Sequence, residues 1–365
     1  MRRLTASAAL LLAALAFSPP PAHSGEPGWH VQLDAPEDLR PLLEEHLDVF
    51  RYRNRSDLDA EIIDRLAAGA AEDARALLAT AGHFSPDIRV DSHREGKLTL
   101  LHISVKPGPQ ARVTTADVRI TGAISQEDAD AARLGQLHRR WRLRPGTEFS
   151  QRAWDDAKDA LLRSLQIDGY PAARITASRA EVDAGAASVE IAVTVDSGPL
   201  FRYGELKIEG LERYPRMLVD NLRRFHTGQR YRHEDLLRYQ SELQGSGFFS
   251  SASVSIDAEA EQAAAATVRV LLTEYPKMKI DLGAGISTDS GPRGEAAFTR
   301  YNTFKPGWQS ITRLNADRKE QTLRSELALL PEPGGWRNRV GVETSRSDIE
   351  ELVTRRLGLI AQRSW

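Results

Sequence analysis

Few residues in this sequence have the types and spacing that catalysis or metal binding requires. Glu44, Glu45 and His46 are adjacent, so on a helix their side chains point apart and cannot share one metal ion. His226 and His233 lie seven positions apart, with no carboxylate at ligand spacing. The sequence contains no His-Glu-x-x-His, no Gly-x-Ser-x-Gly and no phosphate loop. We therefore expect no catalytic residue, no metal site, no cofactor and no enzymatic activity.

The stretch 277–303 contains closely spaced glycines, but its pattern predicts a strand and not a nucleotide-binding turn. Apolar residues alternate there with polar or small ones, namely Met278, Ile280, Leu282, Ala284 and Ile286 with Lys279, Asp281, Gly283 and Gly285. Turn residues follow at 288–292, and 294–303 indicates a return strand. A strand with one apolar and one polar face is typical of a barrel wall between lipid and a wet lumen. A hairpin of a soluble sheet fits this stretch alone equally well.

The first 24 residues have the three regions of a secretory signal peptide. Arg2 and Arg3 supply positive charge, 8–17 is a short apolar run, and Ala22 and Ser24 are small residues at the expected cleavage site. The apolar run is too short for a spanning helix. We predict cleavage after Ser24.

Composition excludes several classes of protein. The first 24 residues contain two of the 49 basic residues and none of the 51 acidic ones, so the formal charge of the remainder is −4. This charge excludes a strongly basic nucleic-acid binder. The sequence has no cysteine, which excludes disulfides, a thiolate metal site and a cysteine nucleophile. Its 365 residues suggest two to four domains, each held by its own core.

Residues 28–276 repeat one plan three times: a strand, two helices and two strands. A glycine closes the second helix of each copy and an aromatic residue follows, as Gly82 with Phe84, Gly169 with Tyr170, and Gly247 with Phe248. Each copy then ends near a proline, at 107–109, 198–199 and 275–276. Two marks that recur in the same order indicate a tandem array.

The pattern places the elements of each copy. The expected strands are 31–33, 88–90 and 98–105, then 116–121, 174–180 and 189–195, then 205–208, 252–256 and 267–272. The expected helices lie over 39–50 and 58–78, then over 127–137 and after an N-cap at Ser150, then over 218–225 and 236–243. Two sets should be buried: Thr99, Leu101, Ile103 and Val105 on a strand, and Trp154, Ala157, Leu161, Leu162 and Leu165 on a helix. We interpret 139–144 as a solvated loop and 258–266 as an exposed hairpin tip.

After Pro276 the helical period disappears and only strand patterns follow. They occupy 277–288, 294–303, 309–318, 321–330, 337–347 and 351–361. The turns 304–308 and 331–336 each contain a tryptophan, as in the interfacial belt of a membrane barrel. Six strands are too few for a closed membrane barrel, so we expect a truncated sequence with most of the barrel missing.

Three such modules behind a signal peptide, followed by a barrel start, resemble the outer-membrane barrel assembly superfamily. The modules resemble its polypeptide-transport-associated (POTRA) domains. Three modules fit the TamA family, whereas BamA proteins typically have five and two-partner secretion transporters two. The segment 285–294 resembles the G-x-x-T-D-x-G-P-R-G pattern of the first TamA barrel hairpin, through Thr288, Asp289, Gly291, Pro292, Arg293 and Gly294. The family's barrel has sixteen strands, and this sequence has room for about six.

The resemblance implies the fold class, an α+β array of three POTRA modules (β-α-α-β-β) followed by the first strands of an antiparallel transmembrane β-barrel. The implied boundaries are 1–24 for the signal peptide, 25–110, 111–200 and 201–276 for the modules, and 277–365 for the incomplete barrel. The implied location is the bacterial outer membrane, with the modules in the periplasm. The implied partners are a TamB-like protein anchored in the inner membrane, outer-membrane client proteins and outer-membrane lipid, but not nucleic acid.

The resemblance also implies a function, in which the modules accept client strands and the barrel helps to insert or secrete proteins such as autotransporters. An unpaired sheet edge can accept an extended segment by β-augmentation. The first barrel strand would act as a gate through Lys279, Ile280, Asp281, Leu282, Gly283 and Gly285, because its glycines weaken pairing with the last strand. Ile280, Leu282 and Ala284 would face lipid, and Asp281 and Gly283 the lumen. Two alternatives remain, a soluble periplasmic scaffolding or binding protein without a closed barrel, and an exported enzyme.

Overall fold

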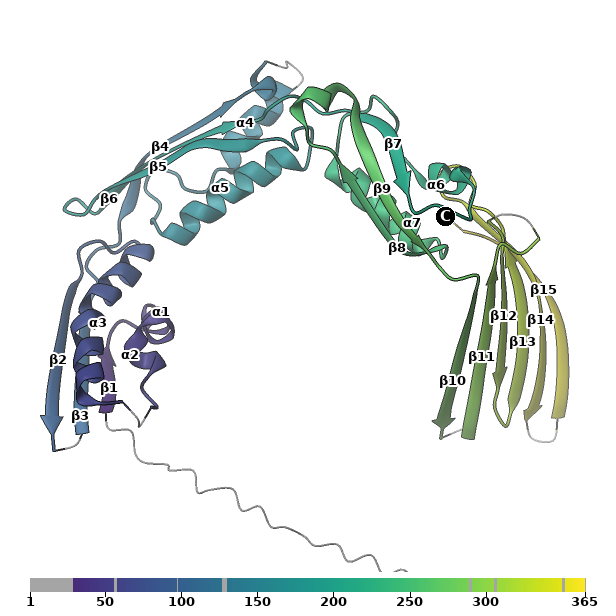
Figure 1. Cartoon of the computed structure of the whole chain (residues 1–365), viewed down its shortest axis with the longest axis horizontal. Coiled ribbons are helices and arrows are strands. Elements are labelled where there is room, and N and C mark those ends of the chain that lie inside the picture. Colours follow the sequence, from purple (N-terminus) through teal and green to yellow (C-terminus); the bar gives the residue numbers. More distant parts are fainter. Residues whose placement is uncertain are drawn as a thin grey trace, which may run out of the picture. The chain divides into compact units, whose positions relative to one another are not determined.

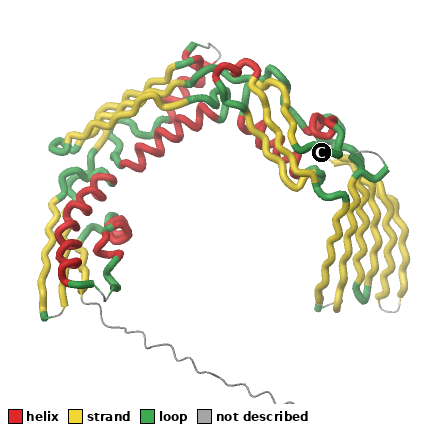
Figure 2. Tube along the Cα trace, in the orientation of Figure 1, coloured by secondary structure: helices red, strands yellow, loops and turns green. Residues whose placement is uncertain are grey.

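In this computed structural model the described residues form three three-stranded sheets with helices and one six-stranded sheet (Figures 1 and 2). The described residues are 29–55, 58–96, 98–126, 130–288, 291–304, 307–349 and 352–364. The expected signal peptide and its cleavage site lie outside them. The chain divides into two compact units. One consists of residues up to 113 together with 146–152 and 182–189, and the other of the remainder.

The first sheet has its last strand in the middle. The elements are β1 (Trp29–Asp34), α1 (Arg40–His46), α2 (Asp48–Arg51), α3 (Ala60–Thr80), β2 (Asp87–Glu95) and β3 (Leu98–Lys106). β3 pairs in parallel with β1 and in antiparallel with β2. α3 begins after Asp59, whose carboxylate accepts a hydrogen bond from the Ile62 backbone N–H at 3.0 Å and so caps the helix.

The core of this first module lies on the face that alternation predicted. Thr99, Leu101, Ile103 and Val105 of β3 are all buried. The single helical face expected over 39–50 is divided between α1 and α2, because Leu47 has an extended backbone with ψ 129°. Val49 and Phe50 after the break are both buried in the same core as Leu43 and Leu47.

The second sheet has the order β4-β6-β5. The elements are β4 (Arg112–Thr121), η1 (Ala123–Ser125), α4 (Ala131–Arg140), α5 (Gln151–Gln166), β5 (Arg174–Asp183) and β6 (Ser188–Asp196). Four of the five residues expected on one face of α5 are buried, and Leu162 is half-buried. The strand at the centre of the sheet, β6, buries Val189, Ile191, Val193 and Val195, as the alternation predicted.

The third sheet repeats the plan of the first. The elements are β7 (Tyr203–Glu209), α6 (Arg216–Leu222), α7 (His233–Gly245), β8 (Phe249–Ile256), η3 (Ala260–Ala265) and β9 (Ala266–Glu274). β9 is again central, parallel to β7 and antiparallel to β8. Aromatic pairs fill the core, with ring centroids 4.2 Å apart for Tyr203 and Phe225 and 5.2 Å apart for Tyr214 and Phe248.

The glycine expected at the end of the second helix lies two or three residues past the helix in each module. Gly82, Gly169 and Gly247 have φ angles of +94°, +85° and +81°, in the region that favours glycine. The aromatic residues that follow them in the second and third modules, Tyr170 and Phe248, are buried. The repeat seen in the sequence is therefore a repeat of structure.

Two segments interpreted as exposed connections contribute to the core instead. In 139–144, Trp141 and Leu143 are buried, and the Trp141 indole packs edge-on against Trp154 at 6.0 Å between ring centroids. In 258–266, Ala263 and Ala266 are buried in the core of the third module. The charge run and the alanine composition hid these side chains, because small or isolated apolar residues give no periodic signal.

The six-stranded sheet is an antiparallel meander in which each strand pairs with the next. The strands are β10 (Met278–Ser287), β11 (Gly291–Tyr301), β12 (Gln309–Ala316), β13 (Glu320–Ala328), β14 (Arg337–Ile349) and β15 (Leu352–Ser364). All six correspond to strands that the sequence predicted. The sheet is open, with β10 and β15 at its two edges. None of the helices in the described residues is long and apolar enough to cross a membrane.

Candidate functional site

Among the described residues, β10 is paired on one side only. It pairs with β11 from Met278 opposite Arg300 to Ser287 opposite Gly291. Its side chains are exposed or half-buried along the whole strand. The N–H and C=O groups of its other edge are therefore open to pairing with a further strand.

The two glycines of β10 leave gaps on one face of this strand. Gly283 lies opposite Glu295, and Gly285 opposite Arg293. A Cβ atom at either glycine would approach its neighbours no closer than 3.5 Å, which is an ordinary contact. Close packing therefore does not require glycine here, and its effect is to remove side-chain contacts that would stabilise the strand.

One face of the six-stranded sheet, here called the apolar face, carries exposed apolar side chains on every strand, with serine, threonine and some charged residues among them. Residues opposite one another in register point to the same face. The row through Leu282 continues through Ala296, Leu314, Leu323, Thr344 and Leu357, and the row through Ile280 through Phe298, Thr312, Ser325, Val342 and Leu359. Leu282 is 80% exposed and Leu359 is 88% exposed. An apolar surface of this extent is a site for a membrane or a protein partner.

The opposite face, here called the polar face, carries a network of ion pairs. Glu326 of β13 is 1% exposed and accepts from Arg313 at 3.0 Å and from Arg324 at 2.8 Å. Arg324 also lies 3.5 Å from Glu343. On β10, the Lys279 ammonium and the Asp281 carboxylate are 2.9 Å apart on this same face. Along the rows through Ile280 and Leu282 and the ion-pair rows behind them, the sheet is therefore amphipathic with period two.

Gly341 of β14 makes room for the centre of the ion-pair network. It lies opposite Glu326 in the register. A Cβ atom at this position would lie 2.5 Å from the Ser325 carbonyl oxygen and 3.0 Å from the Cα and Cγ atoms of Glu326. No side chain fits without displacing the backbone of β13, and no pattern in the sequence indicates this requirement.

The hairpin motif lies at the far end of the β10–β11 pair. Gly291 has φ +75°, and Pro292, Arg293 and Gly294 lie opposite Ile286, Gly285 and Ala284. Asp289 lies outside the described residues. The structure brings the remaining motif residues next to the gate residues because both belong to one hairpin. Their functional role remains a prediction.

The third module is tied to the six-stranded sheet by contacts that the sequence did not predict. Gln309 donates from its side-chain amide to the Gly247 carbonyl at 3.1 Å, and Asn221 donates to the Pro331 carbonyl at 2.8 Å. The rings of Tyr275 and Tyr301 stack with centroids 5.8 Å apart. Gly247 thus ends a helix and also presents its carbonyl to β12.

An ion pair fixes the chain where it leaves the third module. Arg213 lies 2.6 Å from Glu274, whose side chain is 5% exposed. Burial raises the pKa of Glu274, but the backbone N–H groups of Arg213 and Glu212 and the Arg213 guanidinium more than offset this, so the pKa lies below its ordinary value. Next to this pair, burial raises the pKa of Tyr214 to about 12.

Arg230 joins the second and third modules within the second compact unit. Its guanidinium donates to both oxygens of Asp130, at 2.9 and 3.1 Å, and to Asp168 at 3.0 Å. Tyr170 donates its hydroxyl to Asp130 at 2.5 Å, and the guanidinium carbon of Arg230 lies 5.5 Å from the centre of the Tyr170 ring. A Cβ atom at Gly169 would lie 2.7 Å from this guanidinium. Gly169, which follows α5, thus also leaves the space that the guanidinium of Arg230 from the third module occupies.

Charge and backbone contacts both stabilise this junction. Burial raises the pKa of Asp130, but hydrogen bonds from Tyr170 and Arg230 and the nearby positive charges lower it below its ordinary value. The backbone N–H of Gly169 donates to the Tyr231 carbonyl at 2.9 Å, and that of Phe201 donates to the Gly169 carbonyl at 2.8 Å. These partners are far apart in sequence, so no local pattern could have revealed them.

Each module also presents a strand at the edge of its sheet. β2, β5 and β8 are each last in the strand order of their sheets. The side chains of β2 and β5 are exposed or half-buried throughout, and β8 buries only Phe249 and Ala252. These edges have the geometry that β-augmentation requires.

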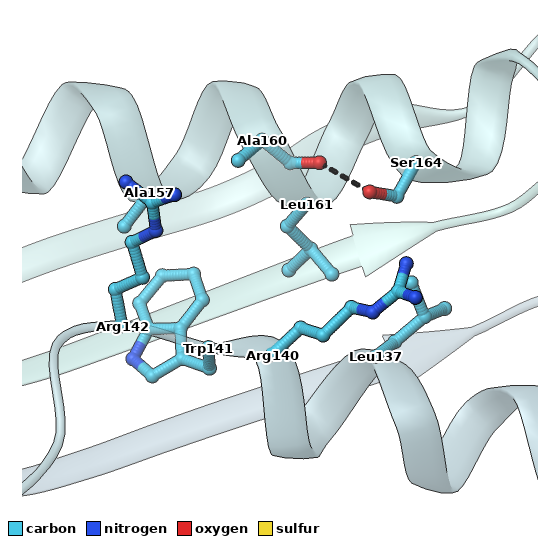
Figure 3. Close-up of a pocket in the computed structure, with 8 residues that line it drawn as sticks. All are labelled: Leu137, Arg140, Trp141, Arg142, Ala157, Ala160, Leu161 and Ser164. Carbon is cyan, nitrogen blue, oxygen red and sulfur yellow. Dashed lines mark hydrogen bonds between the residues drawn. The ribbon is translucent and has the colours of Figure 1, made fainter.

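A cavity of about 230 Å³ lies between α4 and α5. Figure 3 shows Trp141 and Leu161 between the side chains of Arg140 and Arg142. The hydroxyl of Ser164 donates to the Ala160 carbonyl of its own helix at 2.7 Å. The cavity is smaller than typical small-molecule sites.

No chemical centre emerges elsewhere in the described part of the chain. Its His, Asp and Glu residues form no group of three or more that could hold a metal ion. His233 Nδ1 lies 3.2 Å from the Tyr231 hydroxyl. The site that the structure does offer is one of strand edges and sheet faces.

Comparison with solved structures identifies the fold. The crystal structure of BamA from Haemophilus ducreyi lacking POTRA domains 1–3 matches with a TM-score of 0.52 and 16% identity, over 68% of this chain and 47% of that chain. Haemophilus influenzae BamA POTRA3–5 matches over 71% of this chain and all of that chain, with 17% identity and a TM-score of 0.39. CdiB from Escherichia coli matches over 90% of this chain and 55% of that chain, with 14% identity and a TM-score of 0.36.

No family model matches the sequence. The chain spans about half the length of the Haemophilus ducreyi BamA structure. Three modules with a central last strand, followed by an antiparallel meander, agree with the fold class that the sequence predicted. The chain therefore has the fold of POTRA-like α+β modules followed by an open sheet that corresponds to the start of a BamA barrel.

Proposed function

We propose that the protein is an outer-membrane assembly or secretion factor whose modules receive client segments and whose sheet forms part of a membrane barrel. The observation that carries this proposal is the amphipathic six-stranded sheet with an unpaired first strand. Its apolar face is exposed on every strand, whereas its polar face holds a buried carboxylate and ion pairs. A sheet of this kind is stable with lipid against one face and water or polar groups against the other.

The proposed mechanism is strand addition. A client segment pairs first with an edge strand of a module and then with the free edge of β10, and main-chain hydrogen bonds provide affinity without sequence specificity. Gly283 and Gly285 lower the stability of this edge, so a closing strand can be exchanged for a client strand. Lys279, Ile280, Asp281 and Leu282 complete the proposed gate, with Ile280 and Leu282 toward lipid.

The module boundaries and the finer assignment belong to this proposal. We assign the signal peptide to 1–24, the modules to 25–110, 111–200 and 201–276, and the barrel portion to 277–365. The hairpin motif and the three modules support a TamA-like role, with a TamB-like periplasmic partner and clients such as autotransporters. The location is then the outer membrane, with the modules in the periplasm.

The test is site-specific crosslinking from β10 to an outer-membrane client during its assembly. A photoreactive residue at Lys279 is compared with one at Thr299, which lies directly opposite on the same face but on a strand paired on both sides. We expect client adducts from position 279 and few from position 299. Equal adducts at both positions would remove the edge mechanism. Recovery of the mature chain in a soluble fraction without detergent would instead favour a periplasmic scaffolding protein.

A further inference from the structure

A cavity of about 570 Å³ lies at the start of β10, where the chain leaves the third module. Its lining includes Lys277, Met278, Phe298, Arg300 and Tyr301, together with Arg213 from the module. This volume falls in the range of sites that hold small ligands. It belongs to one compact unit of the chain.

The walls of this cavity combine exposed apolar and cationic side chains. Met278 is 56% exposed and Phe298 is 40% exposed, and both belong to the apolar face of the sheet. Lys277 and Arg300 bring positive charge to the same cavity. Such a combination suits an amphiphile with an anionic head and an apolar body.

The side-chain charges of Lys277 and Arg300 are available to a ligand, whereas that of Arg213 is not. Arg213 lies 2.6 Å from Glu274 and is neutralised by it. Within the described residues, no ion pair or hydrogen bond engages the Lys277 ammonium or the Arg300 guanidinium. The Lys277 backbone carbonyl accepts from the Tyr301 N–H at 3.0 Å, and Met278 lies opposite Arg300, so the backbone holds both cations at one end of the strand pair.

The position of the cavity on the sheet identifies the ligand. The Met278–Arg300 pair is the pair of the apolar face nearest to the third module, which the chain leaves just before β10. If the apolar face contacts acyl chains, this end lies at the depth of lipid headgroups, where basic residues attract anionic lipid. Arginine contacts phosphate through two parallel N–H groups, and lysine contributes a point charge.

We propose that this cavity binds the phosphate headgroup of an anionic phospholipid at the module side of the membrane. Lys277 and Arg300 contact the phosphate, and Met278 and Phe298 contact the first part of an acyl chain. The inference rests on the proposed function, because that function places the apolar face in lipid. It adds a lipid-binding site at the module end of β10, where a bound lipid would lie beside the unpaired edge of this strand.

The test measures lipid retained by the full-length protein in detergent micelles, using native mass spectrometry. Phosphatidylglycerol is titrated against phosphatidylcholine, and glycerol phosphate serves as a headgroup without acyl chains. Lys277→Gln with Arg300→Gln is compared with Arg179→Gln with Arg238→Gln, which removes the same charge from exposed ion pairs of the modules. Two basic contacts near a membrane surface correspond to about a thirtyfold difference in affinity.

We expect the first double variant to lose phosphatidylglycerol affinity by about thirtyfold, and the second to keep it within about twofold. Phe298→Ala should weaken lipid retention without changing glycerol phosphate binding. Equal retention of the two lipids, equal affinity in the two double variants, or glycerol phosphate binding as tight as that of lipid would overturn the site. Protease protection in vesicles is measured in parallel. Insertion without the expected lipid preference removes only this inference, whereas failure to insert removes the proposed function as well.

Discussion

Replacing Arg230 by methionine should loosen the junction between the second and third modules. The substitution leaves Asp130, whose side chain is 5% exposed, without its cation. Removing one partner of a fully buried ion pair costs about 3–5 kcal/mol. Arg230 is 25% exposed, and the Tyr170 hydroxyl still donates to Asp130 at 2.5 Å, so the expected loss is about 2–3 kcal/mol.

Hydrogen exchange measured by mass spectrometry reports the loss of stability at the junction itself. The backbone amides of Gly169, Phe201 and His233 donate across the junction, so their exchange reports its opening. A loss of about 2–3 kcal/mol predicts exchange faster by about 30- to 150-fold at these amides. A local readout is needed because several modules need not unfold in one step.

The matched control is Arg238→Met, which breaks an exposed ion pair with Glu234 one turn away on α7. It should cost at most about 0.5 kcal/mol. Adding Asp130→Asn to Arg230→Met removes the buried charge and should recover part of the protection. If Arg230→Met accelerates exchange no more than Arg238→Met does, the buried ion pair does not hold the modules together.

Three further predictions rest on the structure and a fourth on the sequence. Leu282→Arg should destabilise the inserted barrel by about 2–4 kcal/mol and Asp281→Arg by much less, as read from urea unfolding in bilayers, and equal losses would contradict the assigned faces. Gly341→Ala should cost about 1–3 kcal/mol through its 2.5 Å approach to Ser325, whereas Gly294→Ala, whose Cβ has no neighbour within 4 Å, should be tolerated in the same assay. Asp130 and Glu274 have lowered pKa values, so their stabilisation is present above about pH 4 and is lost as the pH falls through the folded-state values. Exchange at the junction, corrected for its intrinsic pH dependence, should therefore be constant from about pH 5 to 8 and rise only below about pH 4, and a rise near pH 6 would point to another group. Mass spectrometry of the mature protein should find Gly25 at the N-terminus, and a chain that still begins at Met1 in the envelope fraction would exclude the signal peptide.

Periodicity predicted most of the strands and helices and the buried faces of those with a regular pattern. The alternation in β3 identified Thr99 and Leu101 as buried, and the alternation in β10 separated Leu282 from Asp281. This works because side-chain direction in a strand depends only on the parity of the position. Where an apolar residue is isolated among charges, as Trp141 is, it gives no periodic signal. The prediction that 139–144 is a solvated loop was therefore wrong for this side chain.

The candidate gate hairpin could also be located from sequence, because its residues are neighbours along the chain. The unpaired state of β10 could not, since an edge is defined by the strand order of the sheet and not by the strand itself. Likewise, the cavity beside Lys277 and Arg300 requires the register that places Met278 opposite Arg300.

The sequence by itself determined the modular repeat, the amphipathic strands and the absence of cysteine chemistry, because these depend on composition and short-range spacing. Only the tertiary structure decided that Arg230 reaches Asp130, that Gln309 reaches Gly247 and that Gly341 makes room for Glu326. The physical reason is that hydrogen bonds and steric exclusion act over a few ångströms in space. Chain folding brings residues to that range from positions as much as 110 apart in the sequence, and no local pattern records such a meeting.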